Sequence, residues 1–211
     1  MKGCVTLQHS LIVAGAGAGS GQDERDSNMA LKQSQLLVVS CGLGVQAAIL
    51  VLLNAYIPAL AGKEAMWVAF QAWAVYFFAG CTPMGGVKAW IGYATGIAAS
   101  IAIIELMGMP GIKDLPAPGG LNFAMAIAVF IVVIPAIMSE NLKNMVPALF
   151  VGSGAFFALF TMISMDAGLL GMDKCAKYCL AVRAELVYCA IGQIFGWITI
   201  WWRGKYEASL K

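Results

Sequence analysis

Charged residues are scarce in this sequence: they make up 11% of the 211 residues, whereas hydrophobic residues make up 61%. A soluble domain carries about 25% charged residues, which help to cover its water-facing surface. The net charge of +2 is small and no run of basic residues occurs, so we expect no nucleic-acid partner. This composition predicts an integral membrane protein.

Histidine is nearly absent as well: the sequence has one, His9, in the N-terminal stretch. The apolar part of the chain therefore cannot hold a bis-histidine haem, a histidine-rich metal centre or a Ser-His-Asp triad. The sequence also lacks a phosphate-binding loop of the Gly-x-x-x-x-Gly-Lys-Ser/Thr type. We expect no catalytic residues, no metal site, no cofactor and no enzymatic activity.

Six apolar runs dominate what is present, and their lengths approach the ~20 residues that span a ~30 Å hydrocarbon core. Backbone polar groups in lipid must be bonded internally, and the runs do not alternate apolar with polar residues, so we expect helices. The predicted fold class is all-α, a polytopic transmembrane helical bundle of about six spans, or five because the second run is short. The runs are Leu36–Ala61, Met66–Gly80, Val87–Met107, Leu121–Met138, Met145–Ser164 and Tyr178–Trp202.

The chain divides into a disordered N-terminal tail at 1–34, a transmembrane helical domain at 35–203 and a short C-terminal tail at 204–211. The part before Met29 reads either as a weak secretory signal or as sequence upstream of the true start codon. With six spans, eight of the 13 Lys and Arg residues fall on the side of the two termini. The excess predicts that both termini are cytoplasmic.

A break rich in glycine and proline, Thr82–Lys88, separates the second run from the third. Pro83 fixes its own φ and disfavours helix at the residue before it. Gly85 and Gly86 can adopt a positive φ at little cost. We therefore expect a fixed backbone turn at the membrane edge, with Lys88 extending to the lipid phosphates.

Polar side chains within the runs are further candidates. Gln71 and Gln193 lie deepest and are predicted to line a polar path, with a plain interhelical hydrogen bond as the alternative. Glu105, Arg183 and Glu185 lie within a turn or two of an interface. We expect these three to anchor the helices there, and a charge relay is the alternative.

Small residues at Gly92, Gly96, Gly152 and Gly154 allow helix backbones to approach closely. Two readings fit them, plain helix packing or a pore lined by backbone. The candidate residues for a solute path or a structural turn are Gln71, Thr82, Pro83, Gly85, Gly86, Lys88, Glu140, Lys143, Pro147, Gly152, Gly154 and Gln193.

Two segments carry residues characteristic of a known family: Tyr76-Phe77-Phe78-Ala79 with Pro83, Gly85-Gly86 and Lys88, and Val146-Pro147 with Phe150, Gly152, Ala155 and Phe157-Ala158. Over roughly 66–160 the chain resembles the YcdZ-like family of small bacterial inner-membrane proteins. The resemblance implies a multi-pass protein of the cell inner membrane. That family is a domain of unknown function, so the resemblance supplies no catalytic residues.

We expect a channel or facilitator for a small, mostly uncharged solute or weak acid, because the helices break at the membrane edge and carry few fixed charges. The missing nucleotide motif makes any transport passive or driven by an ion gradient. A structural or accessory subunit of a membrane complex is the alternative. The expected partners are the lipid bilayer, a small-molecule solute and a second copy of the chain. A channel should show polar residues on one continuous path, whereas an accessory subunit should show a packed interior.

Overall fold

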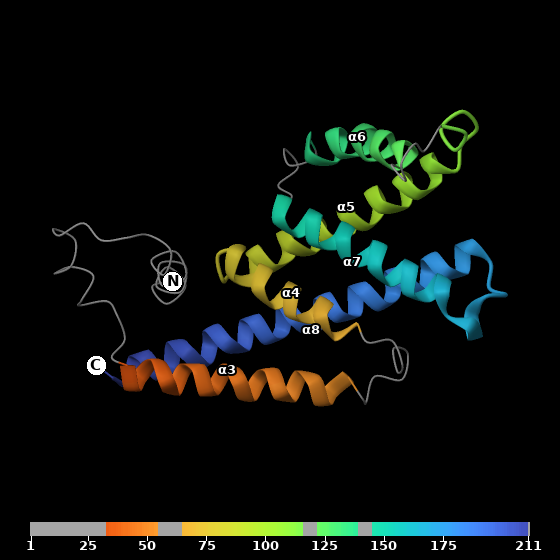
Figure 1. The fold of residues 1–211 in the computed structure, drawn as a ribbon. Coiled ribbons are helices and arrows are strands. Elements are labelled where there is room, and N and C mark those ends of the chain that lie inside the picture. The colour runs from red at the N-terminus through yellow and green to blue at the C-terminus, as the bar shows by residue number, and fades with distance from the viewer. Residues whose placement is uncertain (1–32, 55–64, 116–121, 139–144, 211) are drawn as a thin grey trace.

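The computed structural model of the protein describes residues 33–54, 65–115, 122–138 and 145–210. These residues form six α-helices and one 3-10 helix, and no strand occurs among them, so the all-α prediction is confirmed. The elements are α3 Gln33–Asn54, α4 Met66–Phe78, α5 Pro83–Met107, α6 Phe123–Met138, α7 Val146–Met165, η4 Ala167–Leu169 and α8 Lys174–Ser209 (Figure 1).

Helix length separates the six into two groups. α3, α5, α7 and α8 are each long and apolar enough to cross a membrane. α4 has 13 residues and α6 has 16, which is about 20 and 24 Å at 1.5 Å per residue. Both are shorter than a ~30 Å hydrocarbon core. α8 has 36 residues, about 54 Å, and it continues through Ser209, beyond the predicted domain end at residue 203.

Two pairs of helices form the centre of the protein. α4 packs along α8 and α5 packs along α7, and contacts of α5 and α7 with α8 join the pairs. α3 lies beside α8, and α6 lies beside α5 (Figure 1). Successive helices reverse direction, so the start of α3 and the end of α8 lie at the same end of the structure. Gly42 and Trp202 pack together there.

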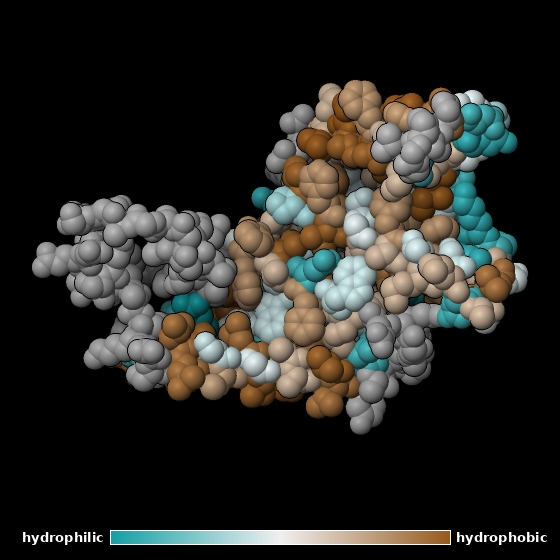
Figure 2. Space-filling view, in the orientation of Figure 1, coloured by the Kyte–Doolittle hydropathy of each residue, from teal (hydrophilic) through white to brown (hydrophobic). Residues whose placement is uncertain are grey.

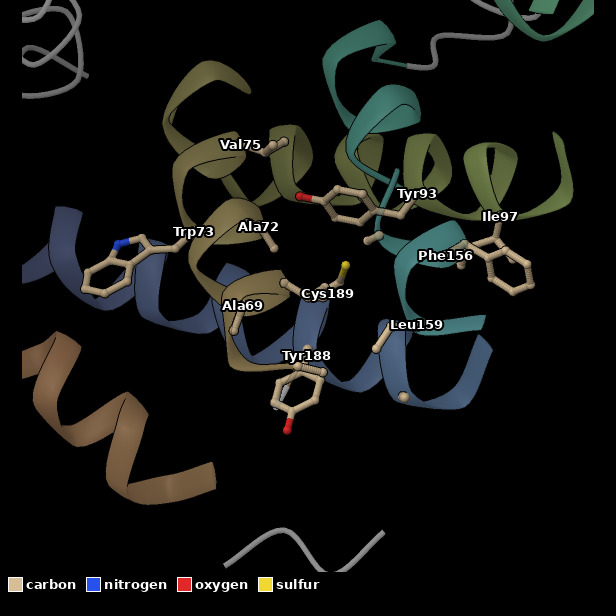
Figure 3. Close-up of a cluster of buried hydrophobic side chains, with 14 of the residues drawn as sticks. Ala69, Ala72, Trp73, Val75, Tyr93, Ile97, Phe156, Leu159, Tyr188 and Cys189 are labelled. Atoms are coloured by element: carbon tan, nitrogen blue, oxygen red, sulfur yellow. The ribbon is translucent and has the colours of Figure 1, made fainter. Parts of the chain in front are cut away.

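The core lies where the two pairs meet. Figure 3 shows Ala69 and Ala72 of α4 facing Cys189 of α8, while the Tyr93 ring extends from α5 with its hydroxyl directed toward α4. Tyr93, Phe156 and the alanines are fully buried. Because helices in lipid gain little from burying apolar surface, small residues that permit close packing supply much of their association.

Glycines mark the closest approaches in both pairs. A Cβ added at Gly152 of α7 would lie 2.6 Å from the carbonyl oxygen of Tyr93 in α5. A Cβ added at Gly192 of α8 would lie 2.8 Å from the Cβ of Ala72 in α4. Only a residue without a side chain fits at such separations. Of the two readings of Gly152, the structure shows helix packing.

The turn between α4 and α5 starts earlier than predicted. The Cys81 N–H donates to the Tyr76 carbonyl at 3.2 Å and the Gly80 N–H donates to the Phe77 carbonyl at 3.2 Å. These bonds form a Schellman motif, in which the residue after the helix adopts the left-handed conformation. Gly80 does so with a φ of 86°, and Cys81 follows with a φ of 56°.

The predicted turn over Thr82–Lys88 is therefore wrong, because α5 already begins at Pro83. Thr82 is the N-cap, and its hydroxyl accepts a hydrogen bond from the Gly85 N–H at 3.0 Å. Gly85 and Gly86 are helical residues without a positive φ. Gly85 is required for a different reason, since its Cβ would overlap the carbonyl group of Ala79. A threonine N-cap followed by a proline at the first helical position is a common way for a helix to begin.

The surface of the described residues is largely apolar. Figure 2 shows hydrophobic residues over α3 and α6, and several hydrophilic residues near the end of α5 and the connection from α7 to α8. α3 has only Val39 and Leu50 in the buried hydrophobic class. Exposed apolar side chains over whole helices suit contact with lipid tails and not with water.

Candidate functional site

An open pocket of about 630 Å³ lies between α4, α5 and α8, next to the start of α5. Its volume falls within the range of small-molecule sites. The residues around it are apolar or aromatic, apart from an amide and a phenol. They are Tyr76, Pro83, Gly86, Val87, Trp90, Ile91, Ala94, Gln193, Ile194 and Trp197.

Gln193 is the amide, and both of its N–H groups are already used. Its Nε2 donates to the carbonyl of Ala72 in α4 at 3.0 Å and to the hydroxyl oxygen of Tyr93 in α5 at 2.8 Å. The opposite amide orientation would place Oε1 against the Ala72 carbonyl oxygen, which is another acceptor. Gln193 therefore ties α8 to α4 and α5, and its Oε1 points elsewhere.

Two buried polar atoms at this pocket have no hydrogen-bond partner among the described residues, the Oε1 of Gln193 and the hydroxyl of Tyr76. Gln193 is 8% exposed and Tyr76 is 2% exposed. A buried polar atom left without a partner costs about 1–3 kcal/mol. Such atoms in a native protein call for an explanation, and a bound solute or water supplies one.

Gly86 provides the space next to both groups. A Cβ at this position would lie 3.2 Å from the Oε1 of Gln193 and 3.3 Å from Cε2 of Tyr76. Those contacts are tighter than ordinary van der Waals distances. The glycine thus lets the amide of α8 and the ring of α4 pack closely against the first turn of α5.

The pocket contains no formal charge, because none of the residues that line it is Asp, Glu, Lys or Arg. Trp90 and Trp197 flank it with large aromatic faces that remain partly exposed. An ion entering such a site would lose its hydration without gaining a partner of opposite charge, which is costly. The arrangement suits a neutral molecule with an apolar body.

Residues 42–204 match the family DUF1097, whose description is "Protein of unknown function". The chain belongs to this family. The match extends from within α3 to within α8, so it includes the pocket and both central helix pairs. No curated protein and no solved structure matches the chain. Belonging to this family therefore assigns no activity to the chain, and a function has to be inferred from the geometry of the pocket.

The structure brings together three of the residues that the sequence analysis singled out: Pro83, Gly86 and Gln193 all line the pocket. Thr82 and Gly85 form the adjacent helix start. Gly152 lies in the seam between α5 and α7. Others lie exposed and away from the pocket: Gln71, Lys88, Pro147 and Gly154. Glu140 and Lys143 fall outside the described residues.

Gln71 was expected to line a polar path together with Gln193, but the pocket is lined by Gln193 and not by Gln71. It lies on the exposed face of α4, whereas the neighbouring Ala72 and Trp73 face the core. Tyr76 and the tryptophans Trp90 and Trp197 are site residues that the sequence analysis missed. The signal that could have found Tyr76 is its spacing of four from Ala72 on the packed face of α4.

Glu185 was expected to anchor α8 at an interface, and this is wrong. Its side chain is 0% exposed, and both carboxylate oxygens lack a hydrogen-bond partner among the described residues. Cys189, Gly192 and Gly196 follow it at spacings of three and four and mark the packed face of α8. That spacing in the sequence could have placed Glu185 inside the bundle.

Glu105 and Arg183 remain on the exposed surface, as anchoring requires. The carboxylate of Glu105 in α5 pairs with the Lys174 ammonium at 2.7 Å and accepts from the Tyr178 hydroxyl at 2.7 Å, both in the first turns of α8. This cluster joins the end of α5 to the start of α8. The cluster lies in the hydrophilic part of the surface, near the end of α5 and the connection from α7 to α8.

Other buried polar groups bridge helix pairs. Trp73 of α4 donates to the Thr199 hydroxyl of α8 at 3.0 Å, and the Thr199 hydroxyl donates to Gln46 of α3 at 2.7 Å. The hydroxyls of Ser100 in α5 and Ser153 in α7 are 2.7 Å apart. These contacts hold neighbouring helices together, and in the described part of the chain they do not form one route with the pocket.

Proposed function

We propose that this protein is a membrane facilitator that binds a small uncharged solute in the pocket between α4, α5 and α8 and lets it cross the bilayer without chemical change. The proposal rests on two buried polar atoms without a partner among the described residues, Gln193 Oε1 and the Tyr76 hydroxyl, whose side chains both pack against Gly86. A solute that bonds to both would satisfy two groups that are otherwise costly to bury.

The location of the pocket supports a role in passage. It opens between helices at the start of α5, where α4 has ended after only 13 residues. A helix of this length covers about 20 Å of the bilayer. A short helix leaves a thinner barrier next to the pocket than a full span would. Passage is passive or coupled to an ion gradient, since the chain has no nucleotide-binding motif.

Uptake into proteoliposomes tests the proposal, with a panel of small amides, weak acids and ions as solutes. The informative variant is Gly86→Ala, which would place a methyl group 3.2 Å from Gln193 Oε1. Gly154→Ala is the matched control, because nothing lies within 4 Å of its added Cβ. We expect Gly86→Ala to lower uptake of the accepted solute while Gly154→Ala retains it. Equal uptake by both variants and by protein-free vesicles would contradict the proposal.

A structural or accessory subunit is the second candidate, and the polar bridges favour it. The contacts of Thr199 with Trp73 and Gln46 and of Ser100 with Ser153 hold a packed interior, which an assembly subunit needs. Purification from native membranes tests it against the first candidate. An accessory subunit should be recovered with one partner in fixed ratio, or as a homo-oligomer, and should transport nothing alone.

We propose the cell inner membrane as the location, with both termini in the cytoplasm. The support is the excess of Lys and Arg on the side of the termini in the sequence, together with the shared end of α3 and α8. The resemblance to the YcdZ-like family stays a prediction of the same kind. Fractionation of membranes from the expressing cell tests the location directly.

A further inference from the structure

We infer, resting on the proposed function, that the solute is a neutral molecule with a hydrogen-bond donor and an acceptor side by side at one end of an apolar body. A primary amide and a protonated carboxylic acid share this chemistry. The inference follows from which atoms of Gln193 and Tyr76 remain free and from what else lines the pocket.

The first requirement is a donor on the solute. Both N–H groups of Gln193 are engaged, by the Ala72 carbonyl and by the Tyr93 hydroxyl oxygen. The only free polar atom of the side chain is Oε1, which can accept and cannot donate. Because two other helices hold the amide, it cannot turn its N–H groups toward the pocket without losing both bonds. A solute must therefore present an N–H or O–H to this atom.

The second requirement is an acceptor close to that donor. The Tyr76 hydroxyl has no partner among the described residues and can donate its proton. Gln193 Oε1 and Cε2 of the Tyr76 ring, the carbon next to the one that bears the hydroxyl, both lie near Gly86, 3.2 and 3.3 Å from the position of a Cβ there. A solute that contacts this part of the pocket wall can accept from Tyr76 and donate to Gln193 through two polar atoms bonded to the same carbon. An amide or a carboxylic acid group has that geometry.

The third requirement is a body without charge. The remaining lining residues are apolar or aromatic, with Trp90 and Trp197 the largest. They offer dispersion contacts and no counter-ion. A carboxylate anion would also place its charge against Gln193 Oε1, which is an acceptor like itself. The site thus selects the protonated acid over its anion.

Binding to the purified full chain tests the inference with three probes: isobutyramide, N,N-dimethylisobutyramide and isobutyric acid. Tryptophan fluorescence follows binding, because Trp90 and Trp197 line the pocket. The dimethyl compound keeps the acceptor and the apolar body but has no donor. We expect it to bind about tenfold more weakly than isobutyramide. The acid should bind in proportion to its neutral fraction as the pH changes, whereas isobutyramide should bind equally across that range.

Tyr76→Phe is the key variant, since it removes a hydroxyl that makes no hydrogen bond with any described residue. Folding should be unaffected, which thermal unfolding checks, and isobutyramide should bind about tenfold more weakly. Gln193→Met should remove the preference for a donor, so that the two amides bind alike. Gly154→Ala serves as the control and should bind isobutyramide as the parent protein does.

The outcomes separate this inference from the proposed function. Equal affinity for the two amides in the parent protein would overturn the inference, and uptake of either would leave the facilitator proposal standing. Tighter binding of the isobutyrate anion than of isobutyramide would also overturn it. Absence of both binding and uptake for every probe would overturn the inference and the proposed function together.

Discussion

Two glycines on α7, Gly152 and Gly154, allow a matched test of how α5 and α7 are held together. They are two residues apart on the same helix and therefore face different directions. A Cβ at Gly152 would lie 2.6 Å from the carbonyl oxygen and 2.7 Å from the Cα of Tyr93. A Cβ at Gly154 would have nothing within 4 Å. We predict that Gly152→Ala destabilises the protein and that Gly154→Ala does not.

The magnitude follows from the shortfall in distance. Ordinary contacts between carbon atoms are about 3.5–4.0 Å, so the methyl at Gly152 is about 1 Å too close. The obstructing atoms belong to the backbone of α5, so no side-chain rotation relieves the overlap and the helices must separate. Overpacking of this kind costs about 1–3 kcal/mol. Both variants gain the same ~1 kcal/mol in helix propensity, and this gain cancels when they are compared.

Gly152→Ala should therefore be less stable than Gly154→Ala by about 1–3 kcal/mol, and Gly154→Ala should equal or exceed the parent protein. Unfolding of both variants in the same detergent, followed by circular dichroism, measures the difference. Size-exclusion chromatography checks that each variant is monodisperse before unfolding. Equal stability of the two variants would refute the close approach of α5 and α7 at Tyr93, and with it the packing role of Gly152.

Three further predictions concern other parts of the chain. Thr82→Ala should lower stability by about 1 kcal/mol and Thr82→Ser should retain it, because the hydroxyl accepts from the Gly85 N–H; equal thermal unfolding of the two variants would argue against this cap. Glu185→Met should raise the free energy of unfolding by about 1–3 kcal/mol, because it removes a buried carboxyl without a partner among the described residues; a decrease would show that the carboxyl is needed. Reporter fusions after Lys211 and near Asp173 should give opposite signals, and matching signals would contradict the alternation of helices across the membrane.

The sequence by itself determined the class of protein and most helix positions. Few charges and long apolar runs leave no fold but membrane helices, since backbone groups in lipid must bond within their own helix. Thr82 and Pro83 carry local signals for a helix start, a hydroxyl cap and a proline without N–H, but the sequence analysis assigned them to a turn and began the next helix at Val87. Asp173 caps α8 in the same way, through the N–H of Ala176. These caps are local effects, so the sequence contains the signals for both helix starts, although the predicted runs begin later than α5 and α8 do.

Only the tertiary structure decided which face of each helix points inward. Gln71 and Gln193 look alike in the sequence, yet Gln71 is exposed and Gln193 holds three helices together. Glu185 lies near an end of its run and is nevertheless fully buried. In a soluble helix, a polar face identifies the outside, but a membrane helix is apolar on every side. Its rotation is set by close packing at positions such as Gly152, where Tyr93 of another helix leaves no room for a side chain.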